Sequence, residues 1–319
     1  MDILRNKFDG NISENSNETL NEPLIRLHPN FNECPKPQHG NNSDELLRVW
    51  ALRHSITHHA LKDLLTIVKQ HYHDKTLPSD PRTLLGTPRN SSKLCLPISG
   101  GKYWHHGLRA CLKQWFGNLS TDIVISININ IDGLPIHKSS KFQLWPILCN
   151  VHEYPDLQVL PIGIFIGKTK PADVNEFLTP FVDEIILFIK NGVVVNDHKV
   201  SIKLRCFICD SPARAFVKGV VNFNGKNGCL KCTITGEYSH ISRTVVFPSI
   251  RCPLRTDEIF RRKEYGRHHT ARESPLLKIP GLDMIQDFVV ADQLHLLELG
   301  IMKRLLTGWR DGNLDLQEK

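Results

Sequence analysis

The stretch "DIVISININIDG" (residues 122–133) constrains the fold of this chain more than any other segment does. Isoleucine occupies every odd position from 123 to 131, and polar residues occupy the even positions from 126 onward. A strict period of two puts alternate side chains on opposite faces, so this segment predicts a half-buried β-strand. The strand ends at Asp132, directly before a glycine that favours a turn. We therefore expect a sheet with a carboxylate at the end of its first strand.

Three later segments extend that sheet. "FQLWPILCNV" (142–151) and "LPIGIFIG" (160–167) flank the turn-forming "HEYPD", which predicts an antiparallel meander of three strands. "KVSIKLRCFIC" (199–209) predicts a fourth strand, and Asp210 follows it directly. Ser211 is expected to cap the next helix, because serine is a favoured N-cap residue.

The segment between the third and fourth strands has helical character. Residues 173–192 carry the apolar spacing of an amphipathic helix, and Gly192 stands where a C-terminal cap belongs. Pro180 lies within this helix and predicts a kink or two helical pieces, because proline cannot donate the backbone hydrogen bond.

Three strands, a helix and a fourth strand follow one another in the order of the ribonuclease-H-like fold. We predict this α/β fold, with a mixed sheet and flanking helices. In that fold the first and fourth strands lie side by side, which would bring Asp132 and Asp210 together. Two adjacent carboxylates repel each other unless a cation such as Mg²⁺ relieves the repulsion, and Mg²⁺ prefers oxygen ligands. The alternative is that both are ordinary acids at strand ends.

The predicted domain organisation has three parts. Residues 1–42 are rich in Asn, Pro and Ser and predict a disordered arm. Residues 43–118 predict a helical N-terminal segment and linker, which includes a helix from Tyr103 to Trp115. Its first two helices form either a helix-turn-helix DNA reader or a plain helical hairpin. Residues 119–319 would form the core, with an insertion at about 219–290.

Composition limits the cellular compartments and the partners that we expect for this chain. The 319-residue chain has a formal net charge of +7, which favours polyanionic partners. Nine cysteines and no signal-peptide pattern favour reduced thiols in the nucleus or cytosol. No apolar run is long enough to cross a bilayer. We expect an intracellular protein with no membrane or small-molecule partner.

The insertion carries a possible zinc site. Cys229 and Cys232 have the two-residue gap that lets both sulfurs reach one Zn²⁺, and a closed site needs two further ligands. The candidate ligands are His268, His269 and His295. The alternative is two plain thiols in a turn. Cys206 and Cys209 share this gap but fall within the fourth strand, so we expect them in the core.

Basic residues gather between positions 251 and 272. A run of this kind is usually a solvated face, but beside a nuclease-like centre it would form a phosphate track, represented by Arg261, Arg262 and Lys263. Arg214 lies one helical turn after Asp210, and would either pair with an active-site acid or hold the scissile phosphate.

Several collinear motifs resemble one family across residues 44–309. The chain is similar to the transposase domain of CACTA-like (En/Spm-related) cut-and-paste DNA elements, in the copies found in animal genomes. The motifs that carry this resemblance are "IDGLPIHKSSKFQLWPIL", "PIGIFIGKTKPADVNEFL", "CDSPARAFVKG", "GCLKC", "EYSHISRTVVF" and "DQLHLLELGIMKRLL".

The resemblance implies a ribonuclease-H-like core with an Asp, Asp, Glu triad that binds two Mg²⁺ or Mn²⁺ ions. Asp132 matches the first acid and Asp210 the second, although Ser211 stands where the family usually has alanine. The implied chemistry is phosphodiester hydrolysis followed by strand transfer on nuclear DNA. Related transposases also combine such a cysteine pair with later histidines.

The third acid is the open question of the sequence. Asp292 and Glu298 are candidates in a predicted helix, but the resemblance places the final glutamate further along the chain. We expect it to be missing, so that the chain is a fragment or a decayed or domesticated copy that binds DNA without transposing it. A non-catalytic DNA- or protein-binding module and an ordinary nuclease remain as alternatives, and self-association into an oligomer stays open.

Overall fold

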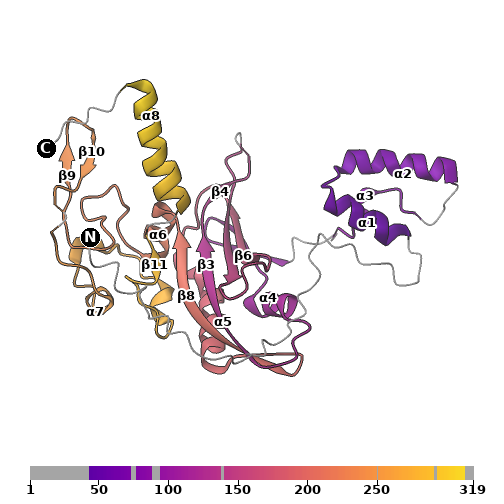
Figure 1. The fold of residues 1–319 in the computed structure, drawn as a ribbon, viewed down its shortest axis with the longest axis horizontal. Coiled ribbons are helices and arrows are strands. Elements are labelled where there is room, and N and C mark those ends of the chain that lie inside the picture. The colour runs from indigo at the N-terminus through magenta and orange to yellow at the C-terminus, as the bar shows by residue number, and fades with distance from the viewer. Residues whose placement is uncertain are drawn as a thin grey trace, which may run out of the picture.

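The computed structural model describes residues 43–72, 77–87, 94–137, 140–249, 251–290 and 293–312 (Figure 1). The arm predicted for residues 1–42 lies outside the described residues. The helices are α1 (Ser43–Arg53), α2 (His58–Tyr72), α3 (Pro81–Leu84), α4 (Leu108–Trp115), α5 (Val174–Asn191), α6 (Ser211–Lys218), α7 (Asp257–Arg261), the short 3-10 turns η2 (Gly266–His268) and η3 (Pro275–Lys278), the π-helix η4 (Gln293–Met302) and α8 (Lys303–Asp311). The strands are β1 (Cys95–Ile98), β2 (Gly101–His105), β3 (Ile123–Ile131), β4 (Leu134–Pro135), β5 (Gln143–Val151), β6 (Leu160–Gly167), β7 (Val193–Val195), β8 (His198–Cys209), β9 (Glu237–Ser239), β10 (Thr244–Val246) and β11 (Phe288–Val289).

The first three helices form a small core of their own. Their buried apolar residues pack together separately from those of the sheet. The Asp80 side chain accepts a hydrogen bond from the Arg82 N–H at 2.7 Å, and Pro81 follows at the first position of α3, so both residues suit the start of a helix. The buried residues are Ala51, Leu61, Leu65, Leu77 and Leu84.

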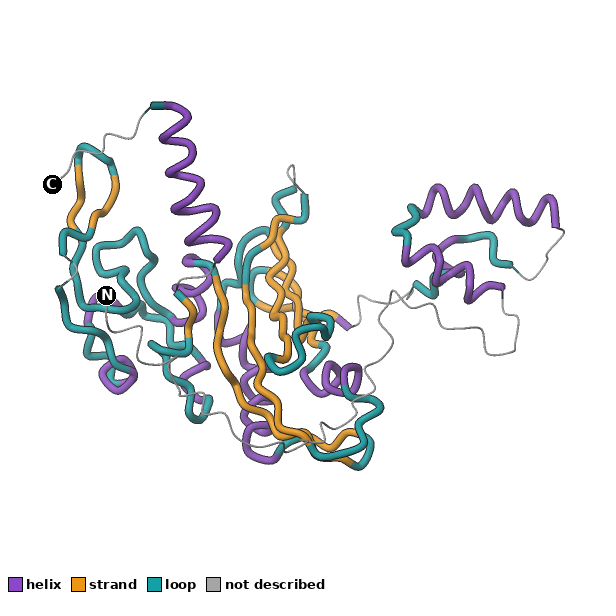
Figure 2. Tube along the Cα trace, viewed as in Figure 1, coloured by secondary structure: helices purple, strands orange, loops and turns teal. Residues whose placement is uncertain are grey.

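A nine-stranded mixed sheet dominates the rest of the structure (Figure 2). Its order is β1-β2-β6-β5-β3-β8-β11, with β4 beside β5 and β7 beside β8. The predicted meander is confirmed, because β3, β5 and β6 pair in antiparallel fashion. The fourth predicted strand, β8, lies next to β3 and runs parallel to it.

The predicted helix from Tyr103 to Trp115 is wrong in its first half. Residues up to His105 form β2, which pairs with β6 so that Tyr103 lies opposite Phe165. The helix begins only at Leu108, after Gly107 with a φ of 88°. Because β1, β2 and α4 share the sheet and its core, the predicted boundary at residue 118 does not separate two structural units.

Three helices cover one face of the sheet. The isoleucines of β3 point into this layer, each at most 7% exposed. The Phe181 ring of α5 meets Phe207 of β8 edge-on at 6.4 Å, and Phe216 of α6 meets Trp145 of β5 at 5.5 Å. The buried thiol of Cys111 places α4 in the same layer.

Helix α5 runs unbroken through Pro180, so the two helical pieces that were one of the predicted outcomes do not occur. The residues on both sides of this proline, including Phe177 and Phe181, are fully buried against the sheet. Their burial holds the helix continuous despite the missing N–H donor. Gly192 ends α5, as predicted, with its N–H bonded to the Phe188 carbonyl.

The predicted insertion at 219–290 is only partly separate from the core. Its first part contains the β9–β10 hairpin and α7, whereas its last part packs on the main core through Leu276, Ile279 and Met284. Its final strand, β11, pairs with β8, and Phe288 stacks on Phe207 with 4.9 Å between ring centroids.

The last described segment is helical, as predicted around Glu298. The π-helix η4 continues directly into α8, and several of its large apolar side chains are exposed. Within the described part of the chain, no helix combines the length and apolar character needed to cross a membrane.

Candidate active site

The two predicted catalytic aspartates leave the sheet at the same edge. Ile131 at the end of β3 is the register partner of Cys209 at the end of β8. Asp132 and Asp210 are the next residues of these two parallel strands. Since neighbouring strands lie about 4.8 Å apart, the two backbones emerge side by side. Sheet pairing therefore brings together two acids that are far apart in the sequence.

Local hydrogen bonds orient each carboxylate. Asp132 Oδ1 accepts the Gly133 N–H at 2.6 Å, and a Cβ at position 133 would lie only 2.8 Å from the Trp145 ring. Asp210 Oδ1 accepts the Ala213 N–H at 2.7 Å, so Asp210 itself is the N-cap of α6. The prediction that Ser211 caps this helix is wrong, because Ser211 is already its first residue.

The charges of both carboxylates affect the pKa of the Cys209 thiol. Burial, with smaller contributions from the charges of Asp210 and Asp132, raises its pKa to about 12, and a backbone hydrogen bond at Ile131 and the Arg214 guanidinium oppose this rise. The thiol therefore stays protonated at neutral pH. Cys206 and Cys209 are both buried, as predicted for core residues.

Arg214 lies beneath the site and not on its surface. Its side chain is 2% exposed, and Nη1 donates to the Val289 carbonyl at 2.7 Å, which ties α6 to β11. A buried guanidinium offers no surface to a DNA phosphate, so the predicted phosphate contact does not fit this structure. The other prediction, that Arg214 pairs with an active-site acid, stays a prediction, and its guanidinium lies close enough to Cys209 to lower the pKa of that thiol.

The cysteine pair has a geometry suited to a shared metal. The sulfurs of Cys229 and Cys232 lie 3.4 Å apart. Burial alone would raise the pKa of Cys229, but hydrogen bonds from the backbone N–H groups of Cys232 and Lys231, together with the Arg255 guanidinium, lower it below its usual value. Cys252 lies near the pair, because Cys232 bridges to Leu254.

The predicted histidine ligands differ in their surroundings. His268 is fully buried and its Nδ1–H donates to the Asn227 carbonyl at 2.7 Å, while burial lowers its pKa to about 4. Its Nε2, like that of His269, has no hydrogen-bond partner among the described residues. The His295 side chain lies outside the described part. No group of three His, Cys, Asp or Glu side chains within the described ranges is close enough together to hold a metal ion.

A comparison with known families identifies the chain. The profile of Transposase family tnp2 matches residues 99–289, which is more than half of the 319 residues. The chain belongs to the tnp2 transposase family. This family is of the En/Spm type, so the resemblance drawn from the motifs is confirmed at the level of the family. A comparison with curated proteins gives no match.

Among the described residues, Glu298 does not join the two aspartates, Asp132 and Asp210, in a metal-binding trio. Glu298 is exposed, and its Oε1 accepts a hydrogen bond from Gln293 Nε2 at 2.8 Å. Asp292 lies outside the described residues.

The basic run of the tnp2 domain is largely paired within the chain. Arg261 Nε bonds to Asp257 at 2.5 Å, and its other nitrogens donate to the carbonyls of Leu277 and Leu282. Because these contacts join α7 to the core, Arg261 is a poor candidate for a phosphate track.

Its two neighbours are on the surface and also paired. Arg262 bonds to Glu258, and Lys263 Nζ lies 3.3 Å from a carboxylate oxygen of Glu273. Exposed ion pairs of this kind contribute little to the stability of the fold. The side chains of Arg262 and Lys263 can therefore leave their carboxylate partners and contact DNA.

Sequence reasoning missed Lys170 as a candidate binding residue. It stands in "GKTKPADV", between the end of β6 and the start of α5, and the structure places it beside α6. The only signal in the sequence was the presence of two lysines just before the N-cap of α5. This signal could not show which residues the lysines face in the folded protein.

Proposed function

We propose that this tnp2 domain is the DNA-cleaving and joining core of a transposase, with a ribonuclease-H-like fold. The strand order supports this proposal, since an antiparallel meander is followed by a strand parallel to its first member. The observation that carries it is the register pair of Ile131 and Cys209, which sets Asp132 and Asp210 side by side. We also propose a nuclear location, because the substrate would be chromosomal DNA.

The residues present fit divalent cations. Both carboxylates sit at one edge, and each is oriented by a backbone N–H, so two hard oxygen donors lie side by side there. Bound Mg²⁺ or Mn²⁺ would activate a water or 3′-hydroxyl and stabilise the leaving oxygen. Asp132 and Asp210 would hold and orient the cations. We assign the protein itself little proton transfer.

Divalent metal binding tests this assignment. We expect Asp132→Asn and Asp210→Asn each to weaken Mn²⁺ binding at least about tenfold in calorimetric titrations, because each removes a charged oxygen ligand. Asparagine keeps the local hydrogen-bond acceptor and caps helices well, so folding should persist. Asp156→Asn, an exposed acid outside the site, is the matched control. Equal Mn²⁺ affinity in all four proteins would contradict the proposal.

A second candidate function is a DNA-binding module that no longer catalyses. The position of Glu298, away from the two aspartates, favours it. We expect this 319-residue chain to cleave element-end DNA weakly or not at all in Mg²⁺ or Mn²⁺. A strong cleavage or strand-transfer product that disappears in Asp210→Asn would exclude the non-catalytic module.

We also propose a structural Zn²⁺ held by Cys229 and Cys232, whose further ligands, from His268, His269 or His295, would move toward the two sulfurs when the metal binds. The short distance between the sulfurs and the buried, unpartnered Nε2 of His268 support it. We expect about one equivalent of zinc in purified protein, lost in Cys229→Ser and Cys232→Ser and kept in Cys95→Ser. Metal analysis that finds no zinc in the wild-type protein would rule the site out.

A further inference from the structure

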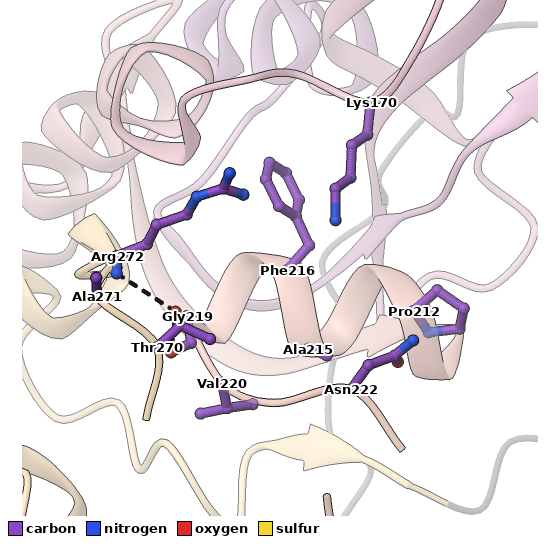
Figure 3. A pocket seen from close by; sticks show the side chains of 10 residues that line it. All are labelled: Lys170, Pro212, Ala215, Phe216, Gly219, Val220, Asn222, Thr270, Ala271 and Arg272. Carbon is purple, nitrogen blue, oxygen red and sulfur yellow. Dashed lines mark hydrogen bonds between the residues drawn. The ribbon is translucent and has the colours of Figure 1, made fainter. Parts of the chain in front are cut away.

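A pocket of about 260 Å³ lies along α6, the helix that Asp210 caps. Lys170 and Arg272 enter it from two different segments, and in Figure 3 their charged ends lie on either side of the Phe216 ring. Pro212, two residues after Asp210, lies at one end of the lining, and Gly219 lies at the other. The pocket therefore runs from the proposed active site toward the C-terminal end of α6.

The backbone fixes where Arg272 enters. Thr270 donates both its N–H and its hydroxyl to the Gly219 carbonyl, at 3.0 and 2.9 Å, and the Arg272 N–H bonds to the Thr270 hydroxyl at 3.3 Å. Gly219 has a φ of 69°, and a Cβ there would lie 2.4 Å from the Arg272 carbonyl oxygen. The close packing of these two segments is thus possible only with glycine at this position.

The loop after β6 fixes Lys170 on the opposite side. The Ala172 N–H bonds to the Ser99 carbonyl at 3.1 Å, and the adjacent Pro171 is buried. Lys170 Nζ lies 5.0 Å from the centroid of the Phe216 ring. A cation over an aromatic ring gains about 0.5–1 kcal/mol when exposed, and its charge is not neutralised.

The two cations face each other without an acid. Neither Lys170 nor Arg272 forms an ion pair with a carboxylate among the described residues, whereas nearby Arg261, Arg262 and Lys263 all do. Burial of its stem and the positive charge of Arg272 both lower the pKa of Lys170. Two like charges held together by the backbone are complementary to an anion placed between them.

From this arrangement we infer that Lys170 and Arg272 form a phosphate subsite for a DNA strand. This inference rests on the proposed function, since the strand that occupies the subsite is the one whose scissile phosphate lies at Asp132 and Asp210. Helix α6 has eight residues and is about 12 Å long, so the subsite would bind a phosphate a few nucleotides from the cleavage point. The ligand class is a nucleic-acid backbone phosphate, and the pocket would hold the strand in register with the acids.

The test compares two double variants with the same loss of charge. Lys170→Gln/Arg272→Gln removes both cations from the pocket, and Lys168→Gln/Lys190→Gln removes two exposed cations that lie outside the pocket lining and outside the basic run at 251–272. DNA affinity is measured by fluorescence anisotropy on full-length protein over a range of salt concentrations. We expect the pocket variant to bind about tenfold more weakly and its salt slope to fall by about one to two, and the control to change less than threefold.

A second measurement separates this inference from the proposed function. Melting temperatures are compared in inorganic phosphate and in chloride at equal ionic strength, because a ligand that binds the folded state stabilises it. We expect phosphate to stabilise the wild-type and control proteins and not the pocket variant.

Three results would overturn the inference in different ways. If wild-type protein binds DNA and both double variants bind equally, the subsite is wrong and the proposed function stands. If phosphate stabilises only proteins with an intact pocket but none binds DNA, the pocket takes free phosphate and both the DNA subsite and the proposed function are wrong. If neither DNA nor phosphate has any effect, both are wrong as well.

Discussion

Replacing Lys218 with methionine is expected to stabilise this protein by about 2–4 kcal/mol at pH 7. Lys218 ends α6 and is 3% exposed, with its Nζ over the rings of Phe260 and Phe288 at 5.3 and 4.9 Å. Burial, with smaller contributions from the positive charges of Lys231, Arg214 and Arg255, lowers its pKa to about 7 against the opposing charge of Asp283. Methionine fills a similar volume and carries no charge to desolvate.

The pH dependence of this effect has a definite sign. The folded pKa of Lys218 lies below the unfolded value of about 10.5, so the unfolded chain binds the additional proton between these two values. The free energy of unfolding of the wild-type protein should therefore rise with pH from about 7 to 10.5, and the advantage of methionine should shrink over this range. Urea denaturation at both ends of the range measures it. Lys113→Met, on the exposed side of α4, is the control and should show neither effect. A Lys218→Met protein no more stable than wild type at pH 7 would contradict the prediction.

Replacing Glu184 with alanine is expected to destabilise the protein by about 3 kcal/mol. Glu184 of α5 accepts the Leu108 and Arg109 N–H groups at 2.6 and 2.9 Å, which are the first donors of α4, and it lies 3.5 Å from His105 Nε2. Alanine would leave these donors without their acceptor where α4 packs against the core. Glu184→Gln keeps one acceptor oxygen and should cost about 1 kcal/mol.

Acid should diminish the contribution of Glu184. Burial alone would raise its pKa, but the hydrogen bonds from His105, Arg109 and Leu108 lower it below the usual glutamate value. Its stabilising effect is therefore complete above the unfolded pKa and is lost as the pH falls through the folded pKa. Chemical denaturation of wild type and Glu184→Gln should accordingly converge at low pH. Asp183→Ala, an exposed neighbour on α5, is the control, and an equal loss of stability in that variant would refute a specific capping role.

Much of the sheet could be predicted because its signals are local. The alternation of isoleucines determined β3, and Asp132 and Asp210 were correctly placed at the ends of their strands. Pairings four residues apart on one helix, such as Asp257 with Arg261, also follow from spacing alone.

Other features depend on partners that spacing cannot show. Residues 103–105 have helical character in the sequence but form a strand, because β6 offers them a pairing edge. Pro180 should break a helix, but the burial of its neighbours against the sheet keeps α5 whole. In both places tertiary packing outweighs a local preference of about 1–3 kcal/mol.

The sequence by itself therefore determined the strands β3, β5, β6 and β8, the positions of the two aspartates, the cysteine pair and the family to which the chain belongs. Only the tertiary structure decided which charged side chains are buried or bonded within the protein and which line a pocket. It buried Arg214 and Lys218, bound Arg261 to backbone carbonyls, and brought Lys170 opposite Arg272 across α6. The physical reason is that periodicity and capping act over a few residues, whereas burial and charge pairing depend on segments that meet only when the sheet and its helices have packed.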